Sequence, residues 1–185
     1  GYAKGYVAGK TSQTGKAGYI GAQKLKFYVE LGEGFEKGFK AARPDGSVMT
    51  AWTNDWDDVA KGKEAALNLI GQGADVIFPS MDNAVVGSLQ GTKEQGKMAI
   101  GIYYDAIKDW PDTVIQSAVF DMRGALGEVI GLAKDGKLEA KPYIFSFDHK
   151  NATRLGTYGP KVPASVPAEV DALLPKLASG EISAK

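Results

Sequence analysis

The sequence predicts an α/β protein built on a doubly wound, mostly parallel sheet, and three observations support this fold class. From Lys16 onward, short β-rich runs alternate with amphipathic helical stretches, as they do in parallel βαβ units with right-handed crossovers. The runs at 75–78 and 98–102 are almost continuously apolar, which is typical of strands buried on both faces. The 185 residues are enough for one well-buried domain, so we expect a single layered core.

The first half of the chain gives two strands and two helices. A strand is expected over 17–21, and the helix after it would end at the turn residues 44–46. A second strand is expected over 47–53, after which Asp58 should cap a helix that ends near Gly73. The first helix is predicted from apolar residues at spacings of three and four, namely Tyr28, Leu31, Phe35, Phe39 and Ala42.

Three further strands are expected over 75–78, 98–102 and 114–120. A helix over 83–95 would connect the first two of these strands and end at Gly96. The last strand leads into another helix, which is predicted from an apolar stripe of Met122, Leu126, Val129, Ile130 and Ala133.

The pattern changes after Gly136. We expect one more strand over 143–147, followed by a turn-rich connection or hinge over 148–167. A final helix should begin near Ser165, and Pro175 should kink or shorten it.

Charge and residue content narrow the possible functions. The 22 Lys+Arg balance 22 Asp+Glu, so the chain lacks the basic surplus that nucleic-acid binding usually requires. The absence of cysteine excludes disulfides and a cysteine nucleophile, and a single histidine argues against a histidine metal cluster. The sequence contains no phosphate-binding P-loop, no dinucleotide-binding glycine motif after a strand and no nucleophile elbow. We therefore expect a binding protein with no enzymatic activity, no cofactor and no nucleic-acid partner.

Targeting signals are also missing from the printed residues. No apolar run reaches the roughly 18 residues of a membrane span, and residues 1–10 lack the apolar stretch and cleavage site of a signal peptide. We expect a soluble chain, and export is compatible with it because a mature exported protein has lost its leader.

The candidate site lies just beyond the strands, because ligands of open parallel sheets bind at the carboxyl ends of the strands. These positions are 22–23, 54–57, 80–83, 103–105 and 121–123. They combine aromatic rings with amides and carboxylates, and Arg123 is their only cation. This composition favours a neutral, flat, hydrogen-bonding small molecule over a phosphate.

Each candidate also has a purely structural interpretation. Trp56 could cover a ligand or pack over the adjacent helix, and both alternatives stay open. Strand alternation sends Tyr103 and Tyr104 to opposite faces, so only one of them should meet a ligand. Asp82 and Asp121 stand where helix N-caps belong, and capping is favoured over ligand contact for both.

Several segments keep their order and spacing over more than a hundred residues. They are G-Y-V-A-G at 5–9, T-G-K-A-G-Y-I-G at 14–21, G-F-E-K-G-F-K-A at 34–41, W-D-D-V-A-K-G-K-E-A-A at 56–66 and L-I-G-Q-G-A-D-V-I-F at 69–78. In these segments, and more weakly up to 177–182, the chain resembles the basic membrane protein family of ABC-importer substrate-binding proteins, which includes the purine nucleoside receptors.

The resemblance implies one lobe of a type I periplasmic-binding-protein clamshell, which closes over a solute and delivers it to an ABC permease in the membrane. It divides the chain into a ligand-binding lobe, residues 1–121, and a returning segment, residues 122–185, with the hinge, the crossover and the C-terminal helix. The opening segment that builds the family's first lobe is missing, so the chain resembles a fragment or a truncated protein. The resemblance also implies a periplasmic or membrane-anchored extracytoplasmic lipoprotein whose leader is not in this chain.

A missing first lobe would leave an apolar face uncovered. The helix after Met122 and the strand near Tyr143 would belong to the absent lobe's sheet, so their apolar side chains should be exposed here. We therefore expect either pairing with another copy of the chain through that face or poor order in that region.

The resemblance also indicates site residues. Residues 101–106 align with the family's G-V-D-x-D-Q segment, so Asp105 matches its second aspartate while Tyr103 replaces the first. Phe120 stands where nucleoside receptors place a lysine, and Met81 and Asp82 replace small residues. A loss of ribose-facing polar groups favours a bare nucleobase or another flat heterocycle over a nucleoside. The predicted ligand-binding residues are Trp56, Phe78, Met81, Asp82, Tyr103, Asp105 and Phe120.

Two other functions fit the same fold class. One is the effector-sensing domain of a transcription regulator of the same clamshell ancestry, which would require a helix-turn-helix segment. The other is a flavodoxin-like enzyme or receiver, and a receiver would require a lysine after the fifth strand, where Phe120 and Asp121 stand.

Overall fold

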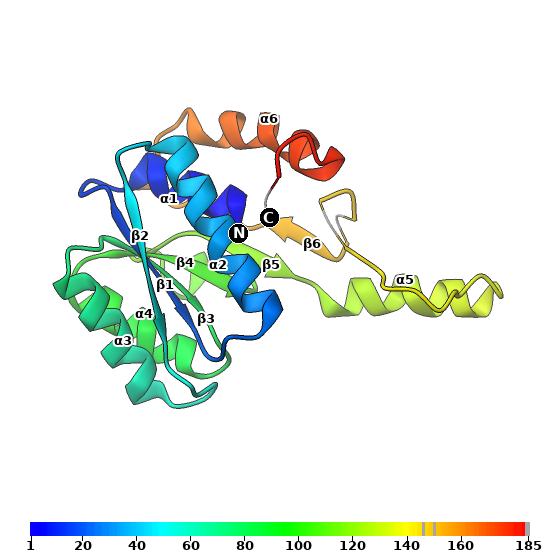
Figure 1. Ribbon diagram of the computed structural model, residues 1–185, viewed down its shortest axis with the longest axis horizontal. Helices are drawn as coiled ribbons and strands as arrows, with labels where there is room; N and C mark the ends of the chain where they lie inside the picture. The colour runs from blue at the N-terminus through cyan, green and yellow to red at the C-terminus, as the bar shows by residue number, and fades with distance from the viewer. Residues whose placement is uncertain (146, 150, 184–185) are drawn as a thin grey trace.

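The sheet of the computed structural model, which describes residues 1–145, 147–149 and 151–183, confirms the predicted α/β class (Figure 1). Within these residues the strand order is β2-β1-β3-β4-β5-β6. The first five strands pair in parallel, and β6 lies antiparallel to β5 at one edge. The strands are β1 Lys16–Gly21, β2 Ser47–Trp52, β3 Val76–Ser80, β4 Met98–Tyr103, β5 Val114–Phe120 and β6 Thr153–Leu155.

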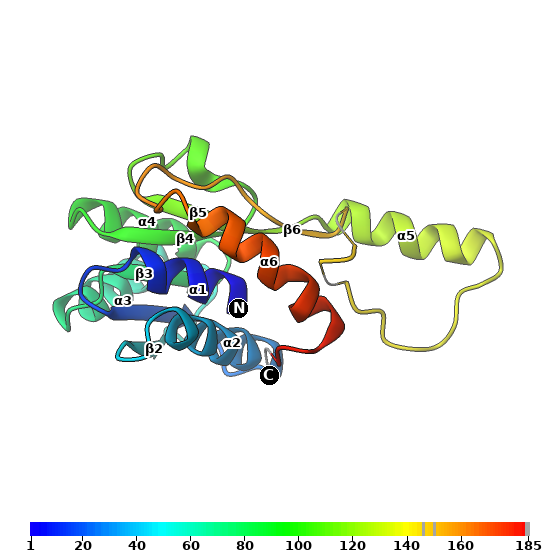
Figure 2. The ribbon, with the colours of Figure 1, turned by 90° about the horizontal axis from the view of Figure 1, so that it is seen from above.

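Helices cover both faces of the sheet, as a doubly wound fold requires (Figure 2). Helices α1 (Tyr2–Thr11), α2 (Lys26–Ala42) and α6 (Val166–Ser179) pack on one face, and α3 (Val59–Gly71) and α4 (Ala84–Glu94) pack on the other. No helix of the described residues has the length and apolar character needed to cross a membrane.

Strand alternation divides the core between the two faces. Tyr19 and Phe78 point toward α1 and α2, where Phe35 lies 5.1 Å from Phe78 between ring centroids. Ile20 and Ile77, the next and the preceding residues of the same strands, point toward α3 and α4. Each of these side chains is completely buried, and burying one large apolar side chain contributes about 1.5–3 kcal/mol.

Helices α1 and α2 lie unusually close together because glycines face each other's backbone. A Cβ atom at Gly5 would collide with the carbonyl oxygen of Phe35, and one at Gly38 would collide with that of Tyr2. The small residues of the 5–9 segment therefore permit backbone contact that any larger side chain would prevent.

Two predicted N-caps are confirmed and one is wrong. The Asp58 carboxylate accepts the N–H of Lys61 at 3.0 Å and caps α3, and Asp121 accepts the N–H of Gly124 at 3.2 Å and caps α5 (Met122–Lys134). Asp82 does not cap α4, because that helix begins one residue later, after Asn83.

The C-terminal part departs most from the sequence prediction. Residues 143–145 and 147 form no strand, and residue 146 of that predicted strand lies outside the described residues. The edge strand is β6 instead, within the segment expected to be a connection, and its three residues are too few for a periodic signal. Helix α6 includes Pro175 and runs on to Ser179, so the proline does not shorten it. Between β4 and β5, in place of an α-helix, the chain forms the short 3₁₀ helix η1 (Ala106–Lys108).

Helix α5 projects away from the body of the protein, as both views show (Figures 1 and 2). Its apolar stripe is exposed, with Met122 65%, Leu126 54% and Ile130 58% accessible. Its outer part packs along no other helix of the described residues, and in its middle Glu128 pairs with His149 at 2.8 Å. The predicted exposed apolar face is therefore present.

Candidate functional site

A cavity of about 580 Å³ lies at the carboxyl edge of the sheet, where β4 and β5 end. Its walls also include the first turns of α2 and α5 and part of the 145–153 segment. Among the described residues, the lining is almost entirely apolar and contains no lysine or arginine. The lining residues are Phe27, Tyr103, Phe120, Asp121, Met122, Ala125, Phe145, Ala152 and Thr153.

Tyr103 enters this cavity from a strained backbone. Its φ of 71° lies in the left-handed region, which is unfavourable for a bulky residue and which concentrates at binding and active sites. The conformation places its ring 6.4 Å from that of Phe120 between centroids, and its hydroxyl 3.4 Å from Oδ1 of Asp82. Tyr104, by contrast, is 51% accessible and does not line the cavity; it lies one residue beyond β4, so the strand alternation used in the prediction does not reach it.

The Tyr103 hydroxyl remains a hydrogen-bond donor at ordinary pH. Partial burial, followed by the neighbouring Tyr28 hydroxyl and the Asp82 carboxylate, raises the pKa of Tyr103 well above its usual value. The phenol is therefore protonated and can donate to Asp82 or to a ligand oxygen or nitrogen.

Aromatic rings continue from the cavity along the edge of the sheet. Phe27 lies 5.1 Å from Tyr28, and Tyr28 lies 5.0 Å from Trp56 between ring centroids. We call this set the aromatic rim: it comprises Phe27, Tyr28, Trp56, Tyr103 and Phe120. Aromatic faces exposed side by side offer stacking partners to a flat ligand.

The charges beside the cavity compensate each other. The Asp121 carboxylate caps α5 and lies 3.6 Å from the guanidinium of Arg154, so both charges are already paired. The described residues contain no group of three or more His, Asp or Glu side chains that could hold a metal ion. Asp121 and Arg154 therefore add no net charge beside the cavity.

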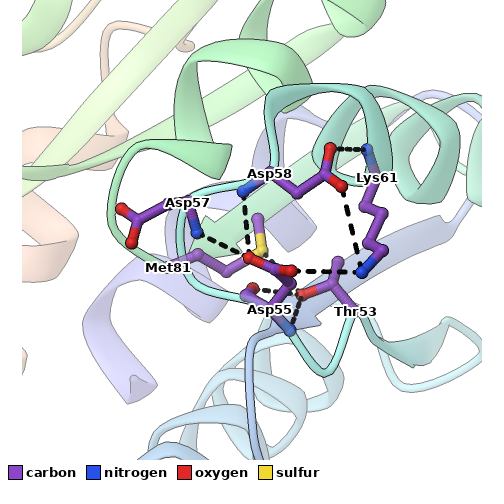
Figure 3. A network of polar contacts seen from close by, with 6 residues as sticks. All are labelled: Thr53, Asp55, Asp57, Asp58, Lys61 and Met81. Atoms are coloured by element: carbon purple, nitrogen blue, oxygen red, sulfur yellow. Dashed lines mark hydrogen bonds and ion pairs between the residues drawn. The ribbon is translucent and has the colours of Figure 1, made fainter.

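Trp56 belongs to a loop between β2 and α3, residues 53–58, which we call the rim loop (Figure 3). The Trp56 carbonyl accepts the N–H groups of Asp82 and Ala84, each at 3.1 Å, so the rim loop is joined to the β3–α4 turn. The Trp56 ring is half-buried, and it packs both against Tyr28 and against the α3/α4 side of the core. The structural interpretation, packing over the adjacent helix, is therefore confirmed, and the ligand-covering interpretation stays a prediction.

The structure brings four of the predicted site residues to this edge. Tyr103 and Phe120 line the cavity directly, Asp82 reaches the Tyr103 hydroxyl, and Trp56 joins the aromatic rim through Tyr28. Their place as ligand contacts stays a prediction.

The structure contradicts the predicted place of Phe78 and Met81 in the site, because both are completely buried and neither lines the cavity. Strand β3 continues to Ser80, two residues beyond the expected end, so Phe78 lies within the strand and packs against Tyr19. Met81 lies beneath the rim loop, with its sulfur 3.5 Å from the hydroxyl of Thr53.

The structure also places Asp105 outside the cavity. Its Oδ2 accepts the N–H of Thr157 at 3.0 Å and the Thr157 hydroxyl at 2.6 Å, and Gly156 packs directly against its carboxylate. Asp105 therefore ties the loop after β4 to the chain that follows β6, and it does not line the cavity.

Sequence reasoning missed several lining residues. Phe27 stands in the first turn of α2, and its only sequence signal was the alternation of lysine and apolar residues over 24–27. Phe145 and Thr153 reach the cavity from the returning part of the chain, and no local pattern predicts that approach.

The fold and the site together define one lobe of a type I periplasmic-binding-protein clamshell, with an aromatic cavity at the carboxyl edge of its sheet. Residues 1–150 match the family described as ABC transporter substrate-binding protein PnrA-like, and the chain belongs to this family.

Known relatives agree with this membership. A purine-binding protein of Brucella abortus is 36% identical over 118 residues, which are 64% of this chain and 33% of the relative. The crystal structure of a transcriptional activator of the comK gene from Bacillus halodurans superposes with a TM-score of 0.85 at 26% identity, covering 98% of this chain and 64% of that one. An ABC transporter solute-binding protein from Conexibacter woesei has a TM-score of 0.77 at 26% identity, covering 98% and 61%.

The chain is shorter than these proteins. It spans between 33% and 56% of the length of the first four curated relatives that it matches.

Proposed function

We propose that this chain is the ligand-binding part of an extracytoplasmic solute receptor of an ABC importer, and that it binds a flat, neutral molecule such as a purine nucleobase without altering it. The observation that carries the proposal is Tyr103, a bulky residue in a left-handed conformation whose ring lines the aromatic cavity beside Phe120. Such strain is retained where binding depends on it. The name of the Brucella abortus relative, a purine-binding protein, supports the ligand class.

The cavity suits this ligand in size and chemistry. Its volume of about 580 Å³ lies within the range usual for small-molecule sites. Stacking of one base on an aromatic side chain contributes roughly 1–3 kcal/mol, and Tyr103 and Phe120 offer two such rings. The Tyr103 hydroxyl, the Asp82 carboxylate and the Thr153 side chain supply polar partners for the edge of a base. A nucleobase is favoured over a nucleoside because few polar groups remain to hold a ribose.

The arrangement of the chain supports a clamshell mechanism. Residues 1–121 would form the ligand-binding lobe, and residues 122–185 would form the returning segment with the hinge and the C-terminal helix. The Asp105–Thr157 contact joins the two parts. Closure of a second wall over the aromatic rim would exclude water and hold the ligand until it reaches the permease.

The projecting α5 fits a partner-dependent protein. Its apolar stripe would be covered by another lobe or by a second copy of this chain, because an exposed surface of this kind usually marks an interaction site. The receptor would work outside the cytoplasmic membrane as a lipoprotein, next to its ABC permease.

Isothermal titration calorimetry tests the ligand proposal. The unmodified chain is titrated with adenine, guanine, hypoxanthine and adenosine, and at least one free base should bind more tightly than the nucleoside. Tyr103→Ala and Phe120→Ala should each weaken binding by roughly 1–3 kcal/mol. Tyr104→Ala is the matched control, because this neighbouring tyrosine points to solvent and should leave affinity unchanged. Equal affinity in all four proteins would remove the cavity as the binding site.

A second candidate function is the effector-sensing part of a transcription regulator. The high structural similarity to the comK activator from Bacillus halodurans favours it. Such a domain would bind its effector at the same cavity but would act on gene expression. Loss of base uptake in a strain lacking the intact protein supports the importer, whereas an unchanged uptake rate with altered transcript levels supports the regulator.

A further inference from the structure

The Asp55 carboxylate organises the rim loop from within. Its Oδ1 accepts the backbone N–H groups of Asp57 and Asp58, each at 3.1 Å, and its Oδ2 pairs with Nζ of Lys61 at 3.1 Å (Figure 3). The Thr53 hydroxyl donates to the Asp55 carbonyl at 2.7 Å. The Asp55 carboxylate thus joins the rim loop to the first turn of α3, and the Asp55 backbone carbonyl joins it to Thr53 after β2.

Trp56 lies between residues that are joined by the Asp55 carboxylate. Asp55 precedes it in the chain, and the two N–H groups that the Asp55 carboxylate holds directly follow it. The Asp57 carboxylate in turn accepts the side-chain amide N–H of Asn83 at 2.9 Å. The backbone on both sides of Trp56 is therefore held by hydrogen bonds, and the Trp56 ring lies 5.0 Å from that of Tyr28.

The same contacts continue to the cavity. The Trp56 carbonyl holds the N–H of Asp82 at 3.1 Å, and the Asp82 carboxylate lies 3.4 Å from the Tyr103 hydroxyl. A continuous set of hydrogen bonds thus runs from Asp55 to Tyr103. Asp55 itself does not line the cavity.

We propose that Asp55 is a positioning residue, which fixes Trp56 and, through Asp82, Tyr103 in their binding orientation before any ligand arrives. The effect on ligand affinity rests on the proposed function, whereas the effect on Trp56 does not. Preorganisation of this kind raises affinity because fewer side chains must be ordered when the ligand binds.

An ionised carboxylate suits this role better than a neutral group. Charge-assisted hydrogen bonds to backbone N–H groups are shorter and stronger than neutral ones. The N–H of Asp57, then the ammonium of Lys61 and then the N–H of Asp58 hold the pKa of Asp55 below its usual value.

Three variants separate positioning from simple stability. Asp55→Ala removes both the acceptor for the two N–H groups and the pair with Lys61. Asp55→Asn keeps an acceptor and loses only the charge. Asp58→Ala is the matched control, because it removes the N-cap of α3 from the same loop and leaves the Asp55 carboxylate in place.

The first readout needs no ligand. In a background of Trp52→Phe and Trp110→Phe, Trp56 is the sole fluorophore of its kind, and acrylamide quenching reports its accessibility. Asp55→Ala should increase quenching, whereas Asp55→Asn and Asp58→Ala should stay close to the background protein. Equal quenching in Asp55→Ala and Asp58→Ala would overturn the proposal.

The second readout is adenine affinity measured by calorimetry in the native tryptophan background. Asp55→Ala should bind about tenfold more weakly, the effect of ordering one or two more side chains on binding. Asp55→Asn should recover most of that loss. If adenine does not bind the unmodified chain, the nucleobase proposal fails, and the quenching result still decides whether Asp55 positions Trp56.

Discussion

Residue 103 tests whether the backbone at the cavity is strained. At most positions alanine gives a more stable protein than glycine, and at residue 103 we expect the opposite order of stability. We compare Tyr103→Gly with Tyr103→Ala. Both remove the ring and its contact with Phe120, so this loss cancels between them. What remains is the backbone preference at φ 71°, which glycine adopts freely and alanine does not.

The size of the reversal follows from two opposing terms. The left-handed conformation costs a residue with a Cβ about 1–2 kcal/mol. Glycine loses about 0.4–1 kcal/mol more through the greater freedom of its unfolded chain. Tyr103→Gly should therefore be more stable than Tyr103→Ala by about 1 kcal/mol. At Tyr104, which has no positive φ, the order should be the ordinary one with alanine more stable.

Urea unfolding followed by circular dichroism measures the four free energies of unfolding. Thermal unfolding gives a second measure, because about 1 kcal/mol corresponds to roughly 2–4 °C in Tm for a chain of this size. Both variants at residue 103 should lose affinity for adenine, since neither retains the ring. If alanine is the more stable residue at both positions, then Tyr103 is not held in a strained conformation, and our reason for placing the site there is wrong.

Two further predictions concern other parts of the molecule. Glu169 accepts the Tyr6 hydroxyl at 2.7 Å and pairs with Lys10 at 2.8 Å, and these contacts lower the pKa of Glu169 from 4.5 to about 2. The contribution of this α1–α6 link to the free energy of unfolding should therefore be full above pH 4.5 and should fade as pH falls toward 2. The free energy of unfolding of Glu169→Gln should depend less on pH in that window. The same pH profile in the variant and the unmodified chain would contradict the assignment. Replacing Leu126 by Lys together with Ile130 by Glu should change the free energy of unfolding by less than about 0.5 kcal/mol per residue, because both side chains are exposed. The double variant should reduce self-association in analytical ultracentrifugation, and a monomeric unmodified chain would exclude the second copy as the partner of α5.

The alternation of strands and helices was predictable because each element carries its own periodic signal. The apolar spacing in α2, the buried run of β4 and the capping position of Asp58 depend on neighbours within a few residues. The prediction that α5 exposes its apolar stripe is confirmed as well. That expectation came from family resemblance, since an amphipathic stripe does not say what covers it.

The site was only partly predictable, because an error of two residues at a strand end moves a side chain from the edge to the core. Strand β3 extends to Ser80, so Phe78 became a core residue. The position of the Asp105 side chain depends on its contact with Thr157, which lies 52 positions later in the chain. The residues next to Asp105 or Thr157 in the sequence do not predict this contact.

The amino-acid sequence by itself determined the order of the elements from β1 to α5, the parallel character of the main sheet and the edge of that sheet where polar and aromatic side chains gather. These properties follow from periodicity, capping and the right-handed crossover, each of which acts over short stretches of chain. Only the tertiary structure decided that Tyr103 adopts a left-handed conformation, that Phe27 and Phe145 close the cavity and that β6 adds to the sheet in the opposite direction. Those outcomes depend on packing between segments far apart in the sequence, and the contacts that hold them are strong enough to override local preference.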